Sequence, residues 1–136
     1  MDLILCLIFI KTILIPSSVK YINDYCFYNC SNLENIIFEE ESNLIRIGIN
    51  IFSYCINLRT IKLPSKLKEI SSKSFECCIE LKSIIILSNI SEIQEYAFLN
   101  CSNLENKSQS FDHLIYSKIL KIHCNYLLRR IFEVLM

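Results

Sequence analysis

The 136-residue chain contains a single glycine, two prolines, two histidines and no tryptophan. One glycine excludes glycine-rich phosphate-binding loops, and the scarcity of both glycine and proline argues against flexible or low-complexity linkers. Charge is also balanced, with 14 basic and 14 acidic residues, so the chain lacks the basic excess typical of nucleic-acid-binding proteins. His113 and His123 have no nucleophile and carboxylate in a recognisable catalytic spacing. We therefore expect no catalytic residue, no cofactor, no metal and no nucleic-acid partner.

What the chain does contain is a repeat. The stretch FYNCSNLEN at residues 27–35 returns as FLNCSNLEN at residues 98–106, and its Phe, Cys and Leu positions recur twice between them. The steps are 25, 23 and 23 residues, and we place the two extra residues of the first step within Glu39 to Glu41. Several apolar columns at one period predict a repeat protein whose units hide their apolar residues by stacking. Three of the columns are Phe27, Phe52, Phe75 and Phe98; Cys30, Cys55, Cys78 and Cys101; and Leu33, Leu58, Leu81 and Leu104.

The repeated unit reads IPSSVKYINDYCFYNCSNLENIIF at residues 15–38 and LPSKLKEISSKSFECCIELKSIII at residues 63–86. It resembles the BspA-like class of leucine-rich repeats in its aliphatic-proline start, its AF-like pair before a cysteine and its closing LxxIxI strand. The resemblance covers roughly residues 7 to 106. The sequence departs from the pattern at single positions, since the small residue before phenylalanine survives only as Ala97 and Ser88 replaces the later proline. The resemblance implies an α/β solenoid with units of about 23 residues.

The segment LENIIF at residues 33–38 alternates and is β-branched, which predicts one short strand per unit. Stacked units place these strands in parallel, about 4.8 Å apart, with Leu33, Ile36 and Phe38 pointing inward. The segment NDYCFYNC at residues 23–30 is too short for a full helix, so we predict one helical or 3-10 turn, capped by Asp24. We thus expect a solenoid over residues 1–106, comprising a half-repeat at 1–14 and about four units.

Four of the eight cysteines fall in one repeat column, namely Cys30, Cys55, Cys78 and Cys101. A column position is set by packing, and free cysteine behaves as a small buried hydrophobe. We predict a buried and reduced column, with a disulfide framework as the alternative. Metal binding at Cys77 and Cys78 is disfavoured because no CxxC pair or suitably spaced histidine accompanies them.

Both ends of the chain allow more than one interpretation. The apolar run from Leu3 to Ile10 suggests a secretory signal or a short anchor, but it lacks a basic start and an A-x-A-like cleavage site. Ile13 and Ile15 fit the strand columns, which favours a half-repeat. Residues 107–136 have a helical period and predict an amphipathic helix that caps the apolar end of the solenoid. A membrane-surface or partner-binding helix is the alternative, so membrane association stays open.

A solenoid offers an extended concave surface, and we predict a non-catalytic protein–protein interaction module that binds there. Leu14, Ile37 and Ile85 form an apolar column around Lys62, as a protein-binding groove requires. The resemblance to BspA-like proteins implies a surface antigen or adhesin, secreted or on the cell surface, with a host or matrix protein as ligand. The alternatives are an intracellular scaffolding repeat and a truncated copy of a longer array. The predicted binding residues are Thr12, Leu14, Asn35, Ile37, Thr60, Lys62, Ser83 and Ile85.

Overall fold

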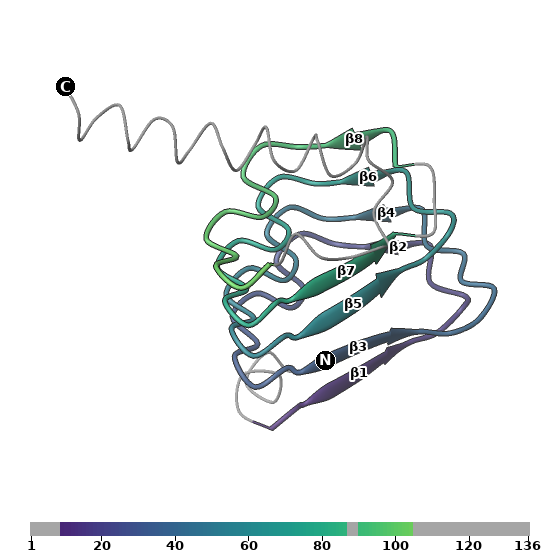
Figure 1. The fold of residues 1–136 in the computed structure, drawn as a ribbon. Helices are drawn as coiled ribbons and strands as arrows, with labels where there is room; N and C mark the ends of the chain where they lie inside the picture. The colour runs from purple at the N-terminus through teal and green to yellow at the C-terminus, as the bar shows by residue number, and fades with distance from the viewer. Residues whose placement is uncertain (1–8, 87–89, 105–136) are drawn as a thin grey trace.

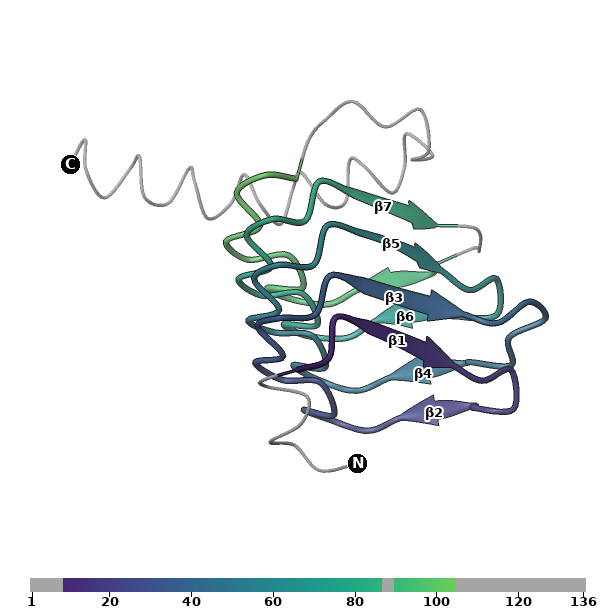
Figure 2. The same cartoon turned by 90° about the horizontal axis from the view of Figure 1, so that it is seen from below.

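The computed structural model describes residues 9–86 and 90–104, which form a parallel β-solenoid of eight strands (Figure 1). Four longer strands form one parallel sheet in the order β1-β3-β5-β7, and four two-residue strands form the pairs β2-β4 and β6-β8 on the other side of the core (Figure 2). The longer strands are β1 (Thr12–Ile15), β3 (Asn35–Phe38), β5 (Thr60–Leu63) and β7 (Ser83–Ile86). The shorter strands are β2 (Tyr21–Ile22), β4 (Arg46–Ile47), β6 (Glu69–Ile70) and β8 (Glu92–Ile93).

The alternation of apolar and polar residues fixes the register of the longer strands. In β5, Thr60 and Lys62 are exposed while Ile61 and Leu63 are buried, and β1 shows the same pattern. Because a shift by one residue would turn every buried side chain to solvent, the register is strongly specified. Ile13 pairs with Ile36, Ile36 with Ile61, and Ile61 with Ile84, which confirms the predicted parallel stacking.

The core lies between the two layers of strands and is built from the predicted columns. Phe27, Phe52, Phe75 and Phe98 stack with ring centroids 5.5, 5.5 and 5.3 Å apart in successive pairs. The leucines Leu33, Leu58 and Leu81 are completely buried beside them. These side chains are apolar and densely packed, so their burial supplies the main stabilisation of each coil against its neighbours.

The predicted helical or 3-10 turn is wrong, because the described residues contain no helix. At residues 23–30 the chain forms linked β-turns in which alternate amides bond within the coil and across to the next one. Tyr28 N donates to Tyr25 O at 3.0 Å, whereas the neighbouring Phe27 N donates to Ile51 O of the next coil, also at 3.0 Å. A helix would keep both amides for its own segment. Tyr25 and Asn29 also have a φ of 58°, which interrupts any right-handed helical run.

These left-handed residues recur in every coil at the same two positions. Of the nine described residues with positive φ, eight form two columns and the ninth is Glu41. A left-handed residue other than glycine costs about 1–2 kcal/mol, so the bonds between coils must hold these turns in place. The two columns are Tyr25, Asn50, Lys73 and Tyr96, and Asn29, Tyr54, Cys77 and Asn100.

Asp24 does not cap its own turn as predicted. Its Oδ1 accepts a hydrogen bond from Ile49 N of the next coil at 2.8 Å. The amides of residues 25–30 in its own turn all donate to backbone carbonyls, whereas Ile49 N donates to the Asp24 carboxylate. Asp24 therefore joins the first two coils.

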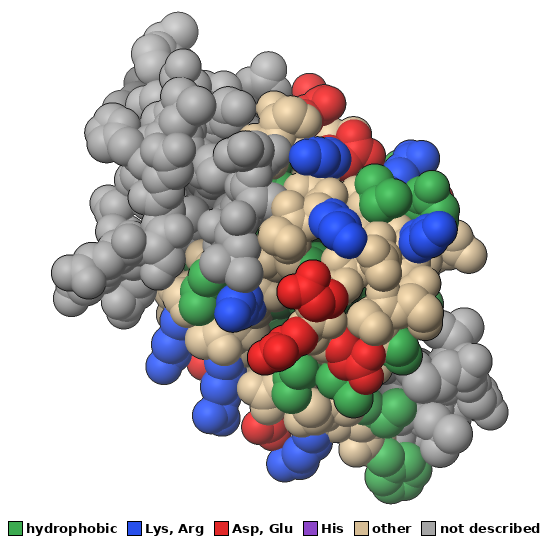
Figure 3. Space-filling model, turned by 90° about the vertical axis from the view of Figure 1, so that its right-hand side faces the viewer, with side chains coloured by type: hydrophobic (Ala, Val, Ile, Leu, Met, Phe, Trp, Pro, Cys, Tyr) green, Lys and Arg blue, Asp and Glu red, His purple; other side chains and the backbone are tan. Residues whose placement is uncertain are grey.

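The loop after β3 carries the extra residues and protrudes beyond the other loops (Figure 2). Glu39, Glu40 and Glu41 are all exposed there, as expected for an acidic insertion. Glu39 turns toward the preceding coil, where its Oε2 accepts a hydrogen bond from Ser17 N at 2.8 Å. Figure 3 looks onto the side of the molecule where these loops lie, and acidic side chains gather near its centre with Lys and Arg side chains around them.

The cysteine column is buried as predicted, and the thiols of Cys55, Cys78 and Cys101 are free. Each of these thiols donates to a phenylalanine carbonyl of the preceding coil; Cys101 Sγ, for example, lies 2.9 Å from Phe75 O. Burial raises the pKa of Cys55 and of Cys101 to about 12, and it raises that of Cys78 well above its usual value. The thiols therefore stay protonated and unreactive at neutral pH.

Cys30 is an exception to the predicted reduced column, because it is disulfide-bonded. The prediction rested on the parallel stacking of identical side chains, which keeps successive sulfurs from pointing at each other. That argument concerns two cysteines of the column. It does not exclude a disulfide between Cys30, the first member, and a cysteine outside the column, and the other three members are free.

The remaining sequence predictions concern segments that lie outside the described residues. These are the choice between a signal or anchor and a half-repeat at residues 1–14, of which residues 1–8 are not described, and the amphipathic helix at residues 107–136. Strand β1 lies within the described part and pairs with β3. Within residues 9–86 and 90–104, no helix has the length and apolarity that a membrane crossing requires.

Candidate protein-binding surface

The outward positions of the four longer strands lie on one face of the sheet, which we call the open face. It consists of Thr12, Leu14, Asn35, Ile37, Thr60, Lys62, Ser83 and Ile85, all exposed except Ser83, which is half-buried. The structure thus brings all eight predicted residues together. Their strands are hydrogen-bonded and their inward neighbours are packed, so the backbone presents these side chains from a rigid support.

The open face has two rows of different chemistry. Thr12, Asn35, Thr60 and Ser83 are paired in successive strands and form a row of hydroxyl and amide groups. In the second row, Leu14 pairs with Ile37 and Lys62 pairs with Ile85. This row is apolar apart from the ammonium group of Lys62.

The sheet is interrupted between β3 and β5. Pairing between these strands ends at Ile36 and Ile61, whereas the β1-β3 and β5-β7 ladders continue through four residues. We attribute the break to the insertion after Phe38. The chain leads outward there, whereas the shorter loop after Leu63 turns back directly. Ile37 and Lys62 are therefore not paired with each other, whereas Lys62 and Ile85 are.

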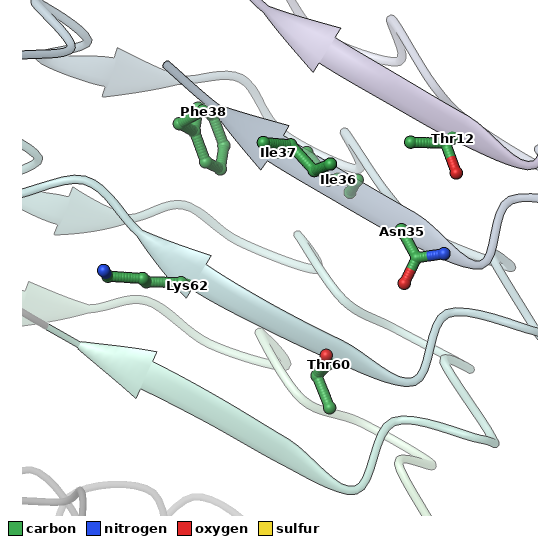
Figure 4. Close-up of a pocket in the computed structure, with 7 residues that line it drawn as sticks. All are labelled: Thr12, Asn35, Ile36, Ile37, Phe38, Thr60 and Lys62. Carbon is green, nitrogen blue, oxygen red and sulfur yellow. The ribbon is translucent and has the colours of Figure 1, made fainter. Parts of the chain in front are cut away.

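The break opens a hollow of about 280 Å³ (Figure 4). Its polar end is formed at the start of the strands, and its other end combines the apolar side chains of Ile37 and Phe38 with Lys62. Phe38 is only half-buried, unlike Ile15 and Leu63 at equivalent positions. The hollow is lined by Thr12, Asn35, Ile36, Ile37, Phe38, Thr60 and Lys62.

Phe38 was predicted only as an inward core residue, and its part in this hollow was missed. The available signal was the longer first repeat step, which places two additional residues directly after this strand. An insertion at a strand end disturbs pairing locally, but the sequence does not show in which direction the chain moves.

The ion pairs of the solenoid leave Lys62 without an acidic partner in the described part of the chain. Lys11 pairs with Glu34 at 3.1 Å and Arg46 with Glu69 at 3.5 Å, in each case linking adjacent coils. Both pairs are largely exposed, so each contributes at most about 1 kcal/mol. None of the ion pairs among described residues includes Lys62. The described residues also contain no group of three or more His, Cys, Asp or Glu side chains able to hold a metal ion.

A family model described as the BspA type leucine rich repeat region matches residues 6–113 in six copies. The chain belongs to the BspA-type leucine-rich repeat family. This confirms the resemblance found in the repeat columns and extends it slightly at both ends. No curated protein matches the chain.

Two solved structures resemble this BspA-type chain. The leucine rich repeat protein of Treponema pallidum has a TM-score of 0.49 and 21% identity, and the match covers 82% of this chain and 70% of that one. A leucine rich cell surface protein of Faecalibacterium prausnitzii has a TM-score of 0.46 and 18% identity, and the match covers 76% of this chain. The present chain spans 40% of the Faecalibacterium chain.

Proposed function

We propose that this BspA-type protein is a non-catalytic protein-interaction module and that its partner binds the open face. The observation that carries the proposal is the exposed apolar row on a sheet whose inward side is already packed. Leu14, Ile37 and Ile85 are 57%, 50% and 36% exposed, so the fold does not require their side chains for burial. Apolar side chains gathered on one rigid surface with polar neighbours are typical of an interaction site.

The composition of the open face supports a protein partner. Protein interfaces combine an apolar centre with polar groups that form hydrogen bonds at the rim. Here the apolar row lies beside a row of hydroxyl and amide groups, and Lys62 is the only charged residue among the eight. Leucine-rich repeat domains typically bind proteins, which agrees with this arrangement.

Replacing Ile37 and Ile85 with aspartate tests the proposal. Both side chains point outward, so each change is expected to alter the free energy of unfolding by no more than roughly 0.5 kcal/mol. A partner would have to desolvate two carboxylates, which is costly when they are unpaired. We expect the double variant to melt like the wild type and to lose at least roughly tenfold in affinity for the partner that wild-type protein retains in a pull-down.

The matched control is Ile56→Asp with Ile79→Asp, which adds the same charges at exposed isoleucines outside the open face. These changes should leave binding unaltered. If instead the control loses binding and the Ile37 and Ile85 variant retains it, the partner binds at the turns and the open face is not the site.

We further propose that the module acts at the cell surface, as an antigen or adhesin for a host or matrix protein. The support is the resemblance to BspA-like proteins, which are often surface antigens or adhesins. A membrane-impermeant biotin reagent applied to intact cells that make the protein should label its exposed lysines. Labelling only after lysis would contradict the surface proposal and favour an intracellular scaffold.

A further inference from the structure

We propose that the open face recognises an extended polypeptide segment in which a carboxylate lies beside a bulky apolar side chain, and that the hollow between β3 and β5 receives this pair. The inference rests on the proposed function and adds the chemistry of the partner. Three features of the hollow support it, namely its exposed walls, its isolated cation and its polar end.

The exposed walls of the hollow favour a segment of a larger molecule. Its volume of about 280 Å³ is at the lower limit of the roughly 300–1,000 Å³ typical of small-molecule sites. Its walls include the exposed side chains of Ile37 and Lys62, so a free small molecule would remain largely in water. An apolar side chain anchored in a polypeptide could cover Ile37 and Phe38 while its neighbours contact the rest of the open face.

The charge of the hollow favours a carboxylate. Lys62 belongs to none of the ion pairs among the described residues, and the carboxylate of Glu39 at the end of β3 accepts a hydrogen bond from Ser17 N of the preceding coil. The ammonium group therefore remains unneutralised beside apolar side chains. A carboxylate would form a charge-assisted hydrogen bond with it, whereas a basic side chain at the same place would be repelled.

The polar end favours a polypeptide backbone. Thr12, Asn35 and Thr60 lie together at the start of their strands and carry hydroxyl and amide groups that both donate and accept hydrogen bonds (Figure 4). The amides and carbonyls of an extended segment require both kinds of partner. A lipid chain offers neither, and it would leave these three side chains facing apolar atoms.

Selection of random linear peptides displayed on phage, with the full-length protein as bait, tests the inference. We expect the enriched peptides to carry Asp or Glu next to, or one position from, a large apolar residue. One enriched peptide is then synthesised with a fluorophore, and its affinity is measured by fluorescence polarisation. Lys62→Glu should weaken that affinity by about tenfold or more, since it replaces attraction with repulsion.

A second selection on Lys62→Glu should enrich Lys or Arg in place of the acidic residue. Lys68→Glu is the matched control, because Lys68 is exposed beside β6 on the other layer of strands and the charge change is the same. It should leave the affinity for the selected peptide within about twofold, since screening at physiological salt limits long-range effects.

The outcomes separate this inference from the proposed function. If the Ile37→Asp and Ile85→Asp variant loses peptide binding but Lys62→Glu does not change it, the predicted carboxylate of the ligand is wrong, whereas the open face remains the binding site. If peptides bind both variants like the wild type, the open face is not the binding site either. If no peptide is enriched, a linear segment is not the ligand, and the pull-down alone then decides whether the open face binds a folded partner.

Discussion

Replacement of Gly48 by alanine is expected to destabilise the protein by about 3 kcal/mol or more. A Cβ atom at this position would lie 2.6 Å from Asp24 Cα and 2.5 Å from the backbone carbon of Asn23. Both contacts are with backbone, which cannot move aside as the end of a side chain can. The two coils would have to separate, weakening the bonds from Tyr25 N to Ile49 O and from Ile49 N to Asp24 Oδ1. The measurement is the midpoint of urea unfolding.

Asn23→Ala is the matched control, because Asn23 holds the equivalent position in the preceding coil and is exposed. Its expected effect is within roughly 0.5 kcal/mol. Equal midpoints for Gly48→Ala and the wild type would show that the first two coils are not packed as closely as described. The only glycine of the chain is thus required for space and not for its backbone angle, since its φ lies outside the left-handed region.

The protein is expected to lose stability steeply above pH 9. Burial raises the pKa of Cys55 and of Cys101 from 9.0 to about 12 in the folded state. Because the folded-state pKa is the higher one, the stabilisation is complete below pH 9 and disappears as the pH rises toward 12. Compared with neutral pH, the free energy of unfolding at about pH 10.5 should be lower by about 2 kcal/mol for each thiol, or by about 4 kcal/mol for the two. Urea unfolding at a series of pH values measures this loss.

The variant Cys55→Ala with Cys101→Ala supplies the control for other alkaline titrations, such as those of lysine and tyrosine. It begins less stable at neutral pH, since two packed side chains are truncated. Its loss of stability between pH 7 and pH 10.5 should nevertheless be smaller than that of the wild type by about 4 kcal/mol. The same pH dependence in both proteins would mean that these thiols are accessible to water in the folded state.

The sequence by itself determined which residues lie inside, where the strands run and to which family the chain belongs. Ile36, Phe52 and Cys78 occupy the buried positions that the columns predicted. This is possible because burial follows the alternation of apolar and polar residues within a few positions, and stacking repeats the same alternation in each coil. The open face follows from the same alternation, since residues between buried ones must point outward.

Only the tertiary structure decided how the backbone of one coil meets the next. The turn at residues 23–30 is not helical, because half of its amides bond to carbonyls of the following coil. The contact between Gly48 and Asp24, and the break that opens the hollow beside Phe38, likewise depend on the path of two coils at once. Partners about 25 residues apart leave no local pattern in the sequence, so hydrogen bonds and close approaches between coils appear only once the coils are stacked.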